Sequence, residues 1–157
     1  MPEAIINEYG LTQDRQRDRR HHGGPERAVC LWSAEIIDQL RADGHEIRAG
    51  SAGENVTIRG LDWKRLVPGS RIHLGDQVIV EITSHAAPCR IIAQCFRDGD
   101  FNRINHQTHS GRSRLYARVA RQGIIHPGDQ VTLEIDSAAD RGARVQPKTT
   151  RWRPPGN

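Results

Sequence analysis

Aromatic residues are scarce in this chain, and their scarcity argues against one common class of partner. They make up 4% of the sequence, and both phenylalanines fall within residues 96–101. Proteins that hold single-stranded nucleic acid stack its bases on aromatic side chains spaced along a basic surface. Nucleic acid is therefore not an expected partner. A polyanion-binding barrel stays open as an alternative only because residues 137–157 are basic.

The sequence also lacks long apolar runs. A membrane-spanning helix needs about 20 consecutive apolar residues, and no such run is present. No apolar segment of the signal-peptide kind follows the first residues either. We therefore expect no membrane partner and a cytoplasmic location. The three cysteines are an odd number, and a reducing compartment would leave them as free thiols.

Several motifs that mark enzymes and metal proteins are missing. The sequence contains no glycine-rich phosphate loop, no Ser–His–Asp motif and no Cys-x-x-Cys pair. Possible zinc ligands do occur, at His85, Cys89, Cys95, His106 and His109. Their spacing does not match a common zinc pattern, so zinc binding is not favoured.

Apolar residues alternate with polar ones in several short segments, a pattern that predicts half-buried strands. The clearest cover residues 77–83, 115–119 and 131–135. Shorter strand candidates cover residues 28–32, 55–58 and 71–74. Two of them share a sequence, GDQVIVEI at 75–82 and GDQVTLEI at 128–135. We interpret this echo as two similar hairpins of one barrel.

Helices are expected to be few. Ser33 can cap a helix over residues 34–43, and Pro88 can open a second helix that continues to Phe96. Many short strands with few helices predict a mainly β fold, a β-barrel domain over residues 1–136. Residues 137–157 are rich in Arg, Pro, Gly and Ala and are expected to form a basic, mobile tail.

Cys89 is the first candidate for chemistry. It follows an expected strand, and if Pro88 opens a helix, the free N–H groups of the first turn would stabilise a thiolate there. A thiolate is a good ligand for a soft metal. The alternative is a small buried side chain. Cys30 and Cys95 lie in apolar segments and are expected in the core, Cys95 with Ile91 and Ile92.

Two further segments carry polar groups suited to a ligand. Residues 53–57 (GENVT) place Asn55 and Thr57 after a glycine that lets the backbone approach closely; a plain turn before a strand is the alternative. Residues 14–25 are rich in arginine, which grips phosphate with paired hydrogen bonds. That segment could equally be a solvated loop, and its histidines could simply be exposed.

Taken in order, six sequence blocks resemble the MOSC family, named for the C-terminal domain of molybdenum cofactor sulfurase. They are GLTQDRQ (10–16), HGGPERA (22–28), GENVTIRGL (53–61), PC (88–89), GRSRLYARV (111–119) and GDQV (128–131). Three features depart from the family pattern. Thr12-Gln13 stands where the pattern has a glycine before Asp14. Arg114 stands where the pattern has glycine, and the family's first strand, which precedes these blocks, is not found.

The resemblance implies a MOSC-type β-barrel with a molybdopterin pocket. Cys89 would be the metal ligand and catalytic residue, and Arg15, His22, Asn55, Thr57 and Arg112 would bind the cofactor. Family reductases act on small N-hydroxylated compounds with electrons from a separate flavin or iron–sulfur protein, and a role in carrying cofactor or sulfur is a further option. The alternative is a non-catalytic β-barrel binding module that has lost the cofactor. Without the first strand, an exposed sheet edge near the N-terminus would favour a homodimer.

Overall fold

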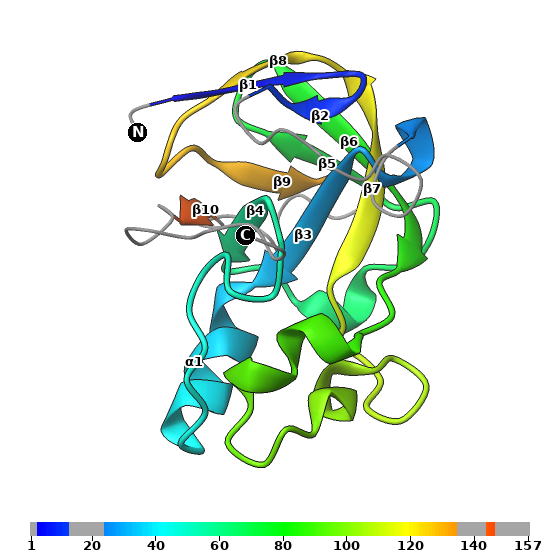
Figure 1. Ribbon diagram of the computed structural model, residues 1–157. Helices are drawn as coiled ribbons and strands as arrows, with labels where there is room; N and C mark the ends of the chain where they lie inside the picture. Colours follow the sequence, from blue (N-terminus) through cyan, green and yellow to red (C-terminus); the bar gives the residue numbers. More distant parts are fainter. Residues whose placement is uncertain (1–2, 13–23, 135–143, 147–157) are drawn as a thin grey trace.

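The computed structural model describes residues 3–12, 24–134 and 144–146, and most of its regular structure is β (Figure 1). The strands are β1 (Ala4–Asn7), β2 (Gly10–Leu11), β3 (Val29–Ser33), β4 (Val56–Arg59), β5 (Arg71–Leu74), β6 (Val78–His85), β7 (Leu115–Arg121), β8 (Gly123–Ile125), β9 (Val131–Leu133) and β10 (Arg144–Gln146). The helices are α1 (Ala34–Ala42) and the 3-10 helices η1 (Pro25–Arg27), η2 (Trp63–Arg65), η3 (Arg90–Cys95) and η4 (Phe101–Ile104).

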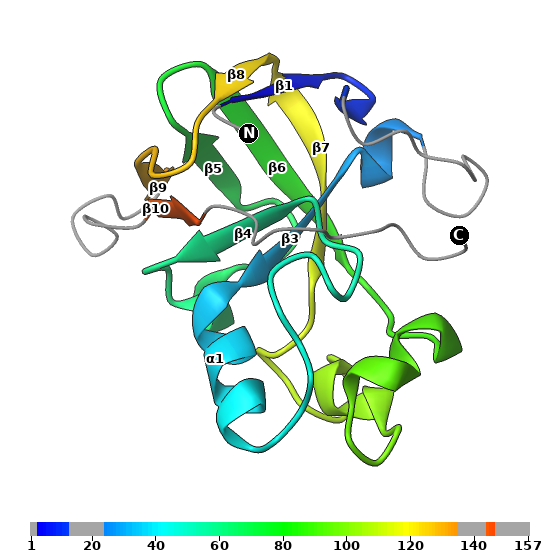
Figure 2. The same ribbon diagram turned by 60° about the vertical axis from the view of Figure 1, so that its left-hand side comes forward.

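Seven strands form one curved sheet in the order β10-β4-β3-β7-β6-β5-β9, which the two views show wrapping around the core (Figure 2). Its outer strands approach each other. The N–H of Val145 donates to the carbonyl of Asp129 (2.9 Å), the N–H of Gly128 donates to the carbonyl of Val145 (2.8 Å), and a bridge joins Gln130 to Arg144. The sheet is thus nearly closed, which confirms the expected β-barrel.

Strand β10 lies within the segment expected to be a tail. It pairs antiparallel with β4, and the side chain of Val145 is buried. For residues 144–146 the expectation of a tail is therefore wrong, because their backbone and one side chain complete the barrel. The other residues of 137–157, apart from these three, lie outside the part of the chain that the structure describes.

The repeated GDQV segments lie on both sides of the same strand. Strand β5 pairs antiparallel with β6 and with β9, so that Leu74 is opposite both Val78 and Val131. The alternation seen in the sequence corresponds to burial, since Val78, Val80, Val131 and other apolar residues of these strands lie in the core. The first segment forms a hairpin from β5 and β6, whereas β9 pairs with β5 and, among the described residues, not with the preceding β8. The expectation of two similar hairpins is therefore wrong for the second segment.

Strands β2, β1 and β8 form a small second sheet in that order, at the opposite end of the barrel from α1 (Figure 1). Strand β1 pairs antiparallel with both neighbours. Within the described residues β2 pairs only with β1, so this sheet has an edge near the N-terminus, where the sequence predicted one.

The expected helix after Ser33 is present as α1. The hydroxyl of Ser33 accepts from the N–H of Ile36 (3.3 Å), and the helix buries Ile36, Ile37 and Leu40. In the described part of the chain, no helix is both long and apolar enough to cross a bilayer.

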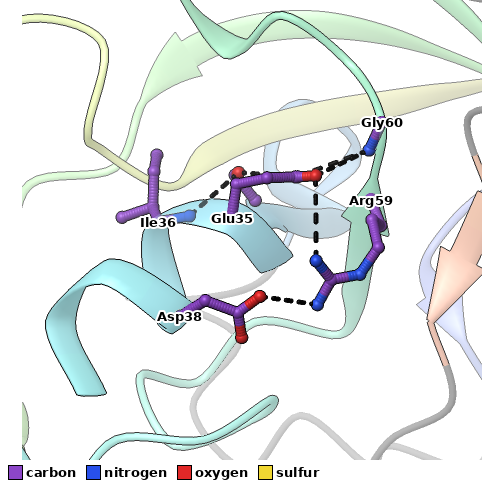
Figure 3. Close-up of polar contacts among 6 residues, drawn as sticks. Glu35, Ile36, Asp38, Arg59 and Gly60 are labelled. Atoms are coloured by element: carbon purple, nitrogen blue, oxygen red, sulfur yellow. Dashed lines mark hydrogen bonds and ion pairs between the residues drawn. The ribbon is translucent and has the colours of Figure 1, made fainter. Parts of the chain in front are cut away.

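Polar contacts tie α1 to the end of β4 (Figure 3). The carboxylate of Glu35 accepts from the N–H of Gly60 (3.0 Å), and the guanidinium of Arg59 pairs with Asp38 (2.8 Å). The helix thereby holds the far end of the GENVTIRGL segment against the barrel.

Candidate functional site

Cys89 lies in the connection between β6 and η3. After His85 the chain runs through residues 86–89 without regular structure, and the exposed Cys89 has extended backbone angles (φ −139°, ψ 172°). The expectation of a helix opened by Pro88 is wrong, because the first helical residue is Arg90 and the helix is a six-residue 3-10 helix. Cys89 therefore does not lie in the first turn of an α-helix, where free N–H groups would stabilise a thiolate. Exposure of the thiol is what makes Cys89 available to a ligand.

The other two cysteines are buried, as expected. Burial raises the pKa of the Cys30 thiol to about 12, and it also raises the pKa of Cys95. The thiol of Cys95 contacts the carbonyl of Ser51 (3.6 Å) and packs with Ile92 in the core. The expected partner Ile91 instead points outward, with 52% of its surface exposed.

Asn55 joins the GENVT segment to β3. Its side-chain oxygen accepts from the N–H of Cys30 (2.8 Å), and its own N–H donates to the carbonyl of Cys30 (2.8 Å). These two bonds continue the parallel pairing of β3 with β4, which begins at the next residue. Asn55 thus has a clear structural role beside the role in cofactor binding that the sequence suggests.

Thr57 and Glu54 form a buried pair in the same segment. Thr57 is 2% exposed, Glu54 is fully buried, and the threonine hydroxyl donates to the carboxylate (3.5 Å). Burial raises the pKa of Glu54 to about 7, although backbone N–H groups and the charge of Arg114 act in the opposite direction. Thr57 therefore presents its hydroxyl to Glu54 and not to the surface.

Arg112 belongs to a loop that two tryptophans hold. The indole N–H groups of Trp32 and Trp63 donate to the carbonyls of Arg112 (3.0 Å) and Ser113 (2.7 Å). The guanidinium of Arg112 donates to the side chain of Gln39 on α1 (2.9 Å). The remaining cofactor-binding candidates, Arg15 and His22, lie outside the described residues.

Arg114, at the end of this loop, connects the segments that carry the candidate residues. Its guanidinium donates to the carbonyls of Ala52 (2.6 Å) and Ala87 (3.2 Å), and only 7% of the residue is exposed. The sequence analysis did not place Arg114 or Glu54 in the site. The one signal for Arg114 was its occurrence at a position where the family pattern has glycine.

A second arginine, Arg27, lies over the ring of Tyr116. The guanidinium of Arg27 is 5.1 Å from the centre of the Tyr116 ring, a cation–π distance. Burial is the largest cause of a raised pKa at Tyr116, with contributions from Cys30 and Cys89. Cys89, Tyr116 and Arg27 therefore belong to one neighbourhood, which the sequence blocks did not predict.

His85 and His106, which the sequence offered as zinc ligands, stack on each other. Their rings are 3.5 Å apart and nearly parallel (4°), and a nitrogen of His85 contacts the hydroxyl of Ser113 (3.1 Å). Burial and the charge of His106 lower the pKa of His85. Among the residues that the structure describes, no three His, Cys, Asp or Glu side chains gather as a metal site would require.

A nearly closed barrel with an exposed cysteine after β6 is the class of protein that these observations define. The MOSC domain model matches residues 18–132, and the chain therefore belongs to the MOSC domain family. The resemblance inferred from the six blocks is thus confirmed.

Individual relatives agree with this assignment. The chain is 30% identical to the uncharacterized protein YflK of Bacillus subtilis over 144 residues, 91% of this chain and 63% of YflK. It is 25% identical to protein YiiM of Escherichia coli over 68% of this chain and 49% of YiiM. It is 27% identical to a protein named reductase from Gibberella moniliformis, of which it covers 20%. The chain thus spans less than two thirds of each of these relatives.

Solved structures show the same fold. YiiM from Geobacillus stearothermophilus superposes with a TM-score of 0.64 at 25% identity, over 83% of this chain and 60% of that one. YiiM from Escherichia coli superposes with a TM-score of 0.61 at 21% identity, over 95% and 63% of the two chains.

Proposed function

We propose that this chain binds molybdenum cofactor with Cys89 as the metal ligand, and that the loaded protein reduces N-hydroxylated compounds. The observation that carries the proposal is the exposure of Cys89. Of three cysteines, it alone is accessible, and it lies in the Pro-Cys block through which the chain resembles its family. A reductase-named relative, matched over a fifth of its length, adds support.

The donor set fits the cofactor at the metal position. Molybdenum bound by a pterin dithiolene already has sulfur ligands, so one soft protein ligand is sufficient, and an accessible thiol is such a ligand. The lack of a three-residue metal cluster among the described residues does not conflict with this arrangement. When bound, the cofactor would supply the change in oxidation state. Cys89 would hold the metal at the barrel surface.

Positive charge is available near the thiol for the anionic parts of the cofactor. Arg27 lies against Tyr116, in the neighbourhood of Cys89, and Arg90 follows Cys89 directly. Arg15 is proposed to hold the terminal phosphate, since arginine binds phosphate through paired, charge-assisted hydrogen bonds. Asn55, Thr57 and Arg112 would act mainly by shaping the pocket, because their side chains already bond to Cys30, Glu54 and Gln39.

Reduction of an N-hydroxylated compound to the amine consumes two electrons and two protons and releases water. We propose that a separate flavin or iron–sulfur protein donates the electrons, and that the small substrate reaches the metal from solution. A cytoplasmic location would keep Cys89 reduced. A carrier of cofactor or sulfur would use the same thiol without a substrate of this class.

Replacement of Cys89 tests the proposal. Purified from a host that makes the cofactor, the parent should contain molybdenum by elemental mass spectrometry and reduce an N-hydroxylated amidine once a chemical electron donor is supplied. Cys89→Ser keeps the volume but exchanges a soft ligand for a hard one. It should lose at least about 100-fold in activity, since replacing even an outer-shell partner of a metal ligand costs about 10–100-fold.

Cys30→Ser and Cys95→Ser are the matched controls. Both side chains are buried, so these variants should lose some stability while keeping molybdenum and activity. A Cys89→Ser protein as active as the parent would show that the exposed thiol is not the ligand.

A non-catalytic binding module is the second candidate function. The observation that favours it is the use of the Asn55, Thr57 and Arg112 side chains in internal contacts. This candidate predicts that the parent contains no molybdenum even when it is purified from a cofactor-producing host. It also predicts that Cys89→Ser and the parent have the same molybdenum content and activity.

A further inference from the structure

Three hydrogen bonds in which Arg114 takes part connect the two segments of the candidate site. The guanidinium of Arg114 donates to the carbonyl of Ala52 in the turn before Glu54 (2.6 Å) and to the carbonyl of Ala87 two residues before Cys89 (3.2 Å). The carbonyl of Arg114 accepts from the N–H of Ala86 (2.9 Å). Ala86 and Ala87 are thus both tied to the same arginine.

Two of these bonds lie away from solvent, whereas the bond to Ala87, an exposed residue, is only partly buried. Ala52 and Ala86 are each 1% exposed, and Arg114 is 7% exposed. A buried carbonyl that loses its donor cannot be compensated by water, so its bond is worth more than a surface bond. The planar guanidinium donates to the two acceptors from two nitrogens held in fixed directions, whereas an ammonium group has one nitrogen whose donors rotate freely.

The positive charge of Arg114 lies near a buried carboxyl group. The fully buried Glu54 lies close enough to interact electrostatically with it. A Cβ atom built on Gly53 would lie 4.0 Å from the guanidinium, so the arginine fills the space beside the GENVT turn. The side chain thus occupies a prepared position between the turn and the Cys89 segment.

We propose that Arg114 is a positioning residue that fixes the Cys89 segment against the GENVT turn, and so sets where the proposed metal ligand lies relative to the pocket. The inference deepens the proposed function and rests on it for its purpose. The positioning itself is a property of the protein without cofactor. Segment 86–89 has no regular structure of its own, so Arg114 replaces the order that a helix or strand would provide.

A nitroxide attached to Cys89 of the cofactor-free protein measures this positioning. Cys89 is the exposed thiol, and Cys30 and Cys95 are buried, so Cys89→Ser should take up no label. In the parent the electron paramagnetic resonance spectrum should be dominated by an immobile component. Arg114→Met removes the donors at similar volume, and it should raise the mobile fraction at least about threefold.

Arg114→Lys covers the case in which Arg114→Met fails to fold. It keeps a positive charge beside Glu54 but has a single nitrogen in place of the two that donate to Ala52 and Ala87, so it should fold and still release the label. Arg118→Met is the matched control. Arg118 lies on strand β7, which begins directly after Arg114. Its replacement removes two bonds to Glu81 (3.0 and 3.2 Å), and the spectrum should match that of the parent.

An Arg114→Lys protein whose label stays as immobile as in the parent would overturn the inference. A label in the Arg118→Met protein that is as mobile as in the Arg114 variants would also overturn it, because the effect would then be general destabilisation. Molybdenum content separates the two proposals. If the parent contains no molybdenum and the label is nevertheless mobile in both Arg114 variants, the cofactor function is refuted and the positioning role stands.

Discussion

At the scale of single residues, the site is built around polar groups that are buried. Glu54 is fully buried, and one of its carboxylate oxygens has no hydrogen-bond partner among the described residues. Arg114 beside it is nearly as buried. Buried charges are costly unless they are paired or neutralised, and the raised pKa of Glu54 shows that protonation is one way in which this site lowers the cost.

Glu54 should make the stability of the protein depend on pH. Its pKa is about 7 in the folded protein against 4.5 ordinarily. Between these values the folded state holds a proton that the unfolded chain releases, so rising pH favours unfolding. The contribution is complete below pH 4.5 and is lost as pH rises through 7. At 1.36 kcal/mol for each pKa unit it is at most about 3 kcal/mol.

Glu54→Gln removes this titration and keeps an acceptor for Thr57. Urea unfolding of parent and variant from about pH 4.5 to pH 8 measures the difference between their free energies of unfolding. All other titrating groups contribute equally to both proteins, so their contributions cancel. The stability of the parent relative to the variant should fall with pH. A constant difference would mean that folding does not raise the pKa of Glu54.

At the scale of elements, barrel closure depends on the shortest pieces of chain. Strand β10 has three residues, yet it pairs with β4 and meets the segment before β9. The site depends in a similar way on elements without regular structure, since segment 86–89 is fixed by Arg114 and the GENVT turn by Asn55. The strands supply a frame, and side-chain bonds to backbone complete it.

Val145→Asp should weaken the closure. The side chain is 6% exposed, so the change loses its apolar burial and places a carboxylate in the core, for an expected loss of about 2–3 kcal/mol in the free energy of unfolding. Gln146→Asp is the control, because neighbouring residues of a strand point to opposite faces. Urea unfolding that gives equal stability for parent and Val145→Asp would contradict the role of β10.

At the scale of the whole molecule, the small sheet offers a surface for association. Within the described residues its strand β2 is paired on one side only, and Ile5 and Tyr9 are 42% and 61% exposed. An unpaired edge with apolar side chains nearby invites a second chain. The proposed homodimer would form here, at the opposite end of the barrel from α1 (Figure 1).

Sedimentation equilibrium tests the homodimer. The parent should show a mass that rises with concentration toward twice the chain mass of 17.6 kDa, because strand pairing across the edge adds backbone hydrogen bonds. Tyr9→Lys should weaken association at least about tenfold by placing charge at the edge. A parent that stays monomeric at about 1 mM would rule the dimer out.

Local patterns in the sequence determined most of the barrel. Alternating apolar residues specified β4 to β7 and β9, because burial of one face depends only on side chains two positions apart. A continuous apolar segment specified β3, which is buried at every position. Ser33 specified the start of α1 through a bond within its own first turn. The six family blocks identified Cys89 as the candidate ligand and the chain as a MOSC domain.

Contacts between distant segments were decided only by the tertiary structure. Strand β10 is too short to show a period, and its partners β4 and the segment before β9 are far away in sequence. The partners of Arg114 are backbone carbonyls, which every residue possesses and which no sequence pattern can mark. Whether Asn55 faces a ligand or Cys30, and whether an arginine is exposed or buried, depends on what the fold brings beside it.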